Sequence, residues 1–133
     1  MKLSLSIFAL VSLFNHGQED KFPKDFRIGE YSYVMTIKKG KNHDDGLDAV
    51  YFVVTRKGNK NNEISSHKAS QRNGQNAIVG SYRINKKFIE FKEVYSQQSI
   101  DSMMKRYYPN KKGNLILTEY TEYKNGISNQ IKL

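Results

Sequence analysis

The chain has 133 residues, which is enough for one domain of ordinary size. Hydrophobic residues make up 38% of it, with nine Tyr and seven Phe, and this content excludes an intrinsically disordered chain. The formal net charge is +9, and cysteine is absent, which excludes a disulfide framework.

The first residues have the pattern of an export signal. Lys2 precedes an uncharged, mostly aliphatic run from Leu3 to Phe14, and polar residues return at Asn15. The run is shorter than the roughly 20 residues that span a bilayer but suits a signal-peptide hydrophobic region. We therefore expect a signal peptide at 1–17 and an exported protein, periplasmic or extracellular, without a cysteine for a lipid anchor. A buried core element of a cytosolic domain is the alternative.

The next residues predict a short lead and the first strands of a single β domain. Residues 18–28 form the lead, where Pro23 disfavours a long helix, and the domain covers 29–133. Apolar and polar residues alternate over 30–38, which is typical of a strand. The apolar run 49–55 predicts a strand buried on both faces. Residues 64–70 predict a weak strand, suited to a sheet edge.

The second half of the chain alternates short strands with clear turn signals. Asn73-Gly74, Asn85-Lys86, Pro109 to Gly113 and Asn125-Gly126 predict turns. The strands expected between and after these turns are 77–84, 88–95, 102–108, 115–123 and 127–133. A short helix through 99–106 is the alternative to the strand at 102–108. Within the strand at 77–84, Gly80 would permit a bend or the close approach of another segment.

About eight strands with hairpin turns predict an all-β antiparallel meander, with a barrel preferred and an open sandwich as the alternative. In a barrel, alternate residues of the strands face the interior. The expected ligand-lining residues are Tyr31, Tyr33, Met35, Ile37, Phe91 and Tyr95.

Gly29-Glu30-Tyr31 would open the first strand of the domain at the place where lipocalins carry Gly-x-Trp. With its export signal and hairpin-rich chain, the sequence resembles the small secreted lipocalin-like proteins of bacteria over most of 29–133. It departs from them in having Tyr31 in place of the tryptophan. The resemblance implies a barrel that binds a ligand in its mouth, and no functional residue is transferred from it.

The basic residues raise the question of a polyanion partner. They are spread along the chain in small groups, mostly at expected turns, where lysine also keeps sheet edges from aggregating. The cluster Lys105, Arg106, Tyr107 and Tyr108 combines cations with rings that can stack on bases or sugars. It is the candidate polyanion site, and nucleic acid is an unexpected partner for an exported protein.

The sequence signals for metal binding and for catalysis are weak. The loop from His43 to Asp48 lacks the ligand spacing of an EF-hand, and we interpret it as a solvated turn. His43 and His67 lack the paired ligands of a zinc site and are expected on the surface. Nucleophile-elbow and phosphate-loop motifs are absent, so we expect a protein that is not an enzyme and carries no cofactor or metal.

These patterns favour an exported, non-enzymatic binding protein that holds a small apolar ligand or an envelope component in a barrel. Two alternatives remain open. One is a protein-interaction module, such as an inhibitor or an immunity protein. The other is a basic barrel that binds polyanions.

Overall fold

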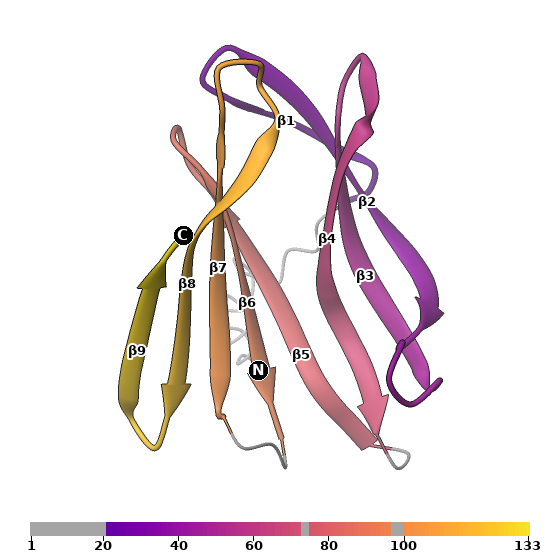
Figure 1. The fold of residues 1–133 in the computed structure, drawn as a ribbon. Coiled ribbons are helices and arrows are strands. Elements are labelled where there is room, and N and C mark those ends of the chain that lie inside the picture. Colours follow the sequence, from indigo (N-terminus) through magenta and orange to yellow (C-terminus); the bar gives the residue numbers. More distant parts are fainter. Residues whose placement is uncertain (1–20, 73–74, 97–99) are drawn as a thin grey trace, which may run out of the picture.

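A computed structural model describes residues 21–72, 75–96 and 100–133, which form one antiparallel sheet (Figure 1). Its nine strands are hydrogen-bonded in chain order, and the described residues contain no helix that could cross a membrane. The strands are β1 (Lys24–Ile28), β2 (Tyr31–Lys41), β3 (Asp48–Arg56), β4 (Asn59–Arg72), β5 (Gln75–Ile84), β6 (Ile89–Tyr95), β7 (Ser102–Pro109), β8 (Leu115–Lys124) and β9 (Ile127–Lys132). The predicted signal peptide and the Asn73-Gly74 turn lie outside the described residues.

The predicted all-β meander is confirmed, and so are its clearest turns. Asn125 and Gly126 both have positive φ, 52° and 79°, as a two-residue hairpin between β8 and β9 requires. The turn between β7 and β8 is fixed by Asn110, whose side-chain oxygen accepts hydrogen bonds from the backbone of Lys112 and Asn114. Local turn chemistry therefore sets the order of the sheet.

Two details of the prediction are wrong. The lead contributes a ninth strand, because Lys24–Ile28 pairs with β2, and Gly29 (φ 62°) lies in the turn between the two. The segment expected as a weak edge belongs to β4, which is 14 residues long and lies between β3 and β5. In both cases pairing with a neighbouring strand outweighs local sequence preference. The strand expected at 102–108 is confirmed as β7 (Ser102–Pro109), so the alternative helix is not formed over these residues.

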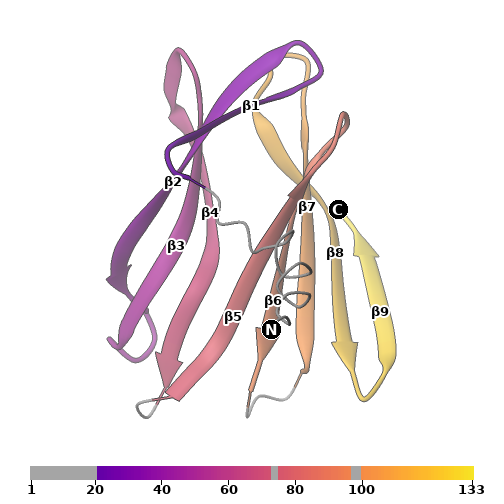
Figure 2. The ribbon, with the colours of Figure 1, turned by 180° about the vertical axis from the view of Figure 1, so that it is seen from behind.

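The sheet is not closed into a barrel. β1 and β9 are its two edges, and each pairs with one neighbour. Figures 1 and 2 show β2–β4 and β5–β9 as two groups that approach at one end and diverge at the other. The groups pack against each other through aromatic rings: the Phe52 ring centre lies 5.3 Å from that of Tyr82 and 6.0 Å from that of Phe91. These rings fill the space that a barrel would enclose.

The core lies between the two groups, towards the turn between β7 and β8. Its buried members are Ile28, Tyr33, Met35, Phe52, Val54, Ile89, Phe91, Tyr107 and Leu115. The turn between β7 and β8 is tied to β2 at this end. The Tyr33 hydroxyl donates to the Gly113 carbonyl at 2.6 Å, and the Tyr31 hydroxyl donates to the Lys111 carbonyl at 2.7 Å. At this end side chains thus join the two groups of strands, whose backbones pair elsewhere, between β4 and β5.

At Gly80 the backbone of β4 lies directly against β5. A Cβ atom built on Gly80 would lie 1.7 Å from the carbonyl oxygen of His67 and 2.8 Å from its carbonyl carbon. No side chain fits there, so the predicted use of Gly80 for a close approach is confirmed. Glu93 of β6 lies opposite Gly80 in the ladder, and the glycine thus brings the His67 backbone near this carboxylate.

Gly80→Ala is expected to destabilise the fold by about 3 kcal/mol or more, because the new methyl group meets rigid backbone. Gly40→Ala is the matched control. Its Cβ would meet the Tyr51 ring at 3.6 Å, an ordinary contact, and the change should stay within about 1 kcal/mol. Urea unfolding of both variants measures the free energies, and equal stabilities would contradict the close approach.

Candidate functional site

The residues expected to line a barrel do not surround a common cavity. Tyr33, Met35 and Phe91 are at most 1% exposed and belong to the core. Tyr31 and Ile37 pack against that core. Tyr95 lines an open pocket together with residues of β2, β3, β4 and β5.

The expected polyanion cluster is divided by the strand geometry. Lys105 and Tyr107 lie on the Glu93 side of the sheet, where burial lowers the pKa of Lys105 against the opposing effect of Glu93. Arg106 binds Glu90 at 2.8 Å and Glu119 at 3.1 Å. The Tyr108 hydroxyl also donates to Glu119. Successive residues of a strand face opposite ways, so the four do not form one basic surface.

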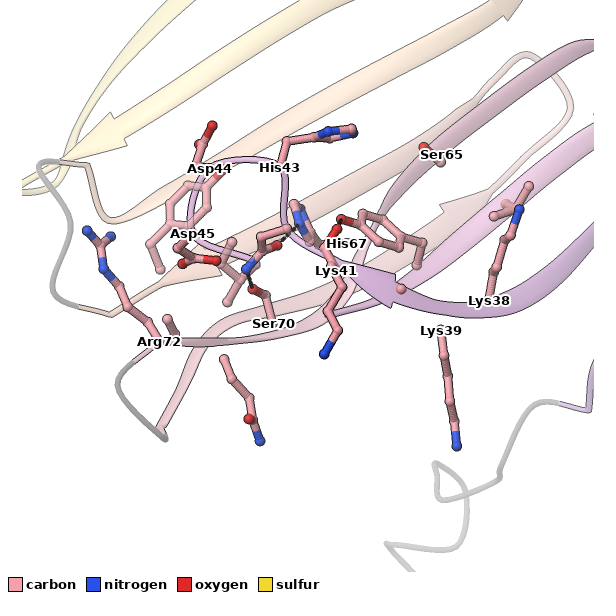
Figure 3. A pocket seen from close by; sticks show the side chains of 18 of the residues that line it. Lys38, Lys39, Lys41, His43, Asp44, Asp45, Ser65, His67, Ser70 and Arg72 are labelled. Atoms are coloured by element: carbon pink, nitrogen blue, oxygen red, sulfur yellow. Dashed lines mark hydrogen bonds between the residues drawn. The ribbon is translucent and has the colours of Figure 1, made fainter. Parts of the chain in front are cut away.

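An open pocket of about 820 Å³ lies beside the loop at 42–47, where the end of β4 pairs with the start of β5 (Figure 3). Its walls are the loop at 42–47, which joins β2 to β3, and parts of β2, β3, β4, β5 and β6. Figure 3 shows His67 and Ser70 beside this loop, with the side chains of Lys39 and Lys41 directed away from His43 and Asp44. This is the candidate site.

The chemistry of the pocket lining is mixed. Four cationic side chains and three carboxylates leave a formal excess of one positive charge, and the rings of Tyr51 and Tyr95 supply apolar surface. Short hydroxyl and amide groups, Gly40 and the aliphatic side chains of Val53, Ala77 and Ile78 complete the lining. The polar and charged members are Lys38, Lys39, Lys41, Asn42, Asp44, Asp45, Glu63, Ser65, Ser70, Gln71 and Arg72, with His43 and His67.

The loop that walls the pocket is held mainly by its own hydrogen bonds. The Asn42 amide donates to the Leu47 carbonyl at 2.9 Å, and the Gly46 amide donates to the Asn42 carbonyl at 3.0 Å. Asp45 accepts from the Leu47 amide at 2.9 Å, and Asp48 pairs with Lys41. Within the described part of the chain no three His, Cys, Asp or Glu side chains are grouped to hold a metal ion.

Beneath the pocket lies a buried carboxylate, Glu93, which is 4% exposed. Its Oε2 atom accepts from the Ser66 hydroxyl at 3.0 Å and from the His67 backbone amide at 3.2 Å. Its Oε1 atom accepts from the Tyr95 hydroxyl at 2.7 Å. These donors come from β4 and from β6 itself, so Glu93 links the two groups of strands.

These donors decide the ionisation of Glu93. Burial alone would raise the pKa of this carboxyl, but hydrogen bonds from His67 and Tyr95 outweigh it and lower the pKa to about 2. Burial and the bond to Glu93 both raise the pKa of Tyr95, which therefore keeps its proton and remains a donor. Glu93 is a carboxylate throughout the physiological pH range.

His67 connects this carboxylate to the pocket wall. Its Nδ1 atom lies 3.4 Å from Oε2 of Glu93, and its Nε2 atom lies 3.1 Å from Oδ1 of Asn42. Asn42 in turn donates through Nδ2 to the buried Ser70 hydroxyl at 2.6 Å. The imidazole also packs on the Tyr51 ring, with 4.8 Å between the centres. The expectation of a simple surface histidine is not met, because the side chain is 25% exposed and held on both sides.

Sequence reasoning missed this group of residues. His67 and Glu93 are 26 residues apart, and a register shift next to Tyr51 in the β3–β4 ladder places His67 opposite that ring. The one local signal is Gly80, which permits the approach of β4. Comparison with protein-family models, curated protein sequences and solved structures returned no match. The resemblance to lipocalin-like proteins therefore stays a prediction.

The low pKa of Glu93 predicts a specific pH dependence of stability. A carboxyl whose pKa is lowered on folding stabilises the protein above its unfolded value of 4.5, and this contribution is lost as the pH falls towards about 2. Glu93→Gln should remove about 3 kcal/mol at neutral pH and flatten the stability curve in that window. Urea unfolding from neutral pH to about pH 2 measures both effects.

Glu63→Gln is the control for that experiment. Glu63 is an exposed carboxylate of the pocket wall, so its substitution should change stability by no more than about 0.5 kcal/mol. Equal curves for the wild type and Glu93→Gln between pH 4.5 and 2 would show that the buried carboxylate is not held ionised.

Proposed function

We propose that the protein is a non-enzymatic binding module that holds a small hydroxyl-rich ligand, such as a saccharide unit, in the pocket beside the loop at 42–47. The observation that carries the proposal is the mixed lining of that pocket. Tyr51 and Tyr95 supply aromatic surface, and hydroxyl, amide and charged side chains surround them. The proposal retains the predicted export of the chain.

The polar lining argues for a polar ligand. An apolar molecule would bury Ser65, Gln71 and Asp44 without hydrogen-bond partners, at about 1–3 kcal/mol for each unsatisfied group. A saccharide instead offers hydroxyls to these groups and the apolar face of its ring to an aromatic side chain. We therefore expect a polar ligand in place of the apolar one predicted from the sequence.

The nearly balanced charge of the pocket lining also limits the charge that a ligand can carry. The four cations and three carboxylates of the lining nearly neutralise one another, and Lys41 is already paired with Asp48. A strongly anionic ligand would meet the carboxylates as well as the lysines. A neutral or singly charged saccharide therefore suits the pocket better than a polyanion.

The proposal is tested by titrating the protein with neutral mono- and disaccharides while following its backbone amide NMR signals. Shifts should be confined to residues of the pocket, and Ser65→Trp should weaken binding at least about tenfold by filling it. Ser128→Trp is the control, since Ser128 is an exposed residue of β9 outside the pocket. No shift up to about 50 mM saccharide, or binding of a fatty acid in the pocket instead, would refute the proposal.

A further inference from the structure

The last strand, β9, is an open edge of the described sheet. It pairs with β8 on one side, and no described strand lies on its other side. Residues 127–131 are all exposed, and among them Ile127 is 72% and Ile131 42% exposed. We propose that this edge pairs with β9 of a second copy of the chain, antiparallel and about a two-fold axis, so that the two sheets become one.

The outward-facing backbone groups of β9 follow from its pairing with β8. The Leu133 amide donates to the Thr118 carbonyl at 2.9 Å, and the ladder between the two strands has no register shift. Backbone groups alternate in direction along a strand, so the odd-numbered residues of β9 bond to β8. The amides and carbonyls of Ser128 and Gln130 therefore point away from β8, and an antiparallel neighbour would give each of them a partner.

The side chains of β9 are arranged symmetrically about Asn129. Ile127 and Ile131 lie two residues before and after it, and Ser128 and Gln130 are its direct neighbours. When Asn129 of one copy lies opposite Asn129 of the other, Ser128 of each copy forms a hydrogen-bonded pair with Gln130 of the other. In the same register Ile127 of each copy lies opposite Ile131 of the other, on one face of the joined sheet. One register therefore satisfies the outward backbone groups and pairs the exposed apolar side chains.

The other edge of the sheet, β1, is less suited to a second copy. Three of its five residues are charged, namely Lys24, Asp25 and Arg27, and charged residues keep sheet edges from pairing. Residues 127–131 of β9 carry no charge, and in the proposed register no charged residue lies opposite another. This difference between the two edges favours a closed pair of copies over an open-ended chain of them.

The dimer is measured by sedimentation velocity of the full chain between about 5 and 500 μM. A pair of short strands buries less surface than a standard interface, so we expect a monomer–dimer equilibrium with a Kd of about 10–100 μM. Hydrogen exchange at the two ends of this range locates the contact. Protection of the Ser128 and Gln130 amides should rise at least about threefold with concentration by mass action, while that of the Asn129 amide, which bonds to β8, should change little.

Two substitutions in β9 test the proposed register. Gln130→Pro removes an amide that points away from β8, so it should weaken the dimer at least about tenfold while the hairpin of β8 and β9 stays formed. Gln130→Ala keeps that amide and is the matched control, with a Kd expected within about twofold of the wild type. Ile131→Lys places a charge opposite Ile127 of the second copy and should also weaken the dimer at least about tenfold. Its control is Val79→Lys, which replaces a 56% exposed aliphatic side chain of β5 and should leave the dimer intact.

A chain that stays monomeric at about 500 μM would overturn the proposal. So would species larger than a dimer, concentration-dependent protection on β1 instead of β9, or a dimer that both Gln130→Pro and Ile131→Lys leave unchanged. The lining of the pocket comes from the loop at 42–47 and from β2 to β6, so these results are independent of saccharide binding.

Discussion

The arrangement of the strands depends on the need to supply hydrogen-bond donors to the buried carboxylate of Glu93. An ionised group that is 4% exposed must be compensated by donors, and here three hydrogen bonds and the His67 ring supply them. Two of these bonds come from β4, which is separated from β6 by β5 in the sheet. The carboxylate therefore requires β4 to pass close over β5, and Gly80 provides the space.

The close passage of β4 over β5 also sets the position of the pocket. On one side of it the two groups of strands pack through Phe52, Tyr82 and Phe91, and the side chains form a filled core. On the other side, where the end of β4 pairs with the start of β5, the loop at 42–47 forms part of the pocket wall. His67 lies at the boundary, so one residue contacts both the buried carboxylate and the wall of the pocket.

Much of the fold was predictable because it depends on local signals. Alternating residues and turn signals such as Asn125-Gly126 gave the order and direction of most strands, and Gly80 was singled out correctly. The curvature of the sheet was not predictable from the sequence, because it arises from contacts between residues far apart in the chain, such as Tyr33 with Gly113. The candidate site was not predictable either, because Glu93 and His67 meet only where β4 passes close over β5. The aromatic residues expected around a ligand instead fill the core, since alternation shows which face is apolar but not whether another layer covers it.

The most direct test of this account is a double-mutant cycle between Glu93 and His67, with Gln at each position, measured by urea unfolding near pH 5. The account predicts that the two substitutions are coupled by at least about 1 kcal/mol, because each removes the partner of the other. Additive effects of the two substitutions would contradict the claim that the buried carboxylate holds His67 and, through it, the pocket wall.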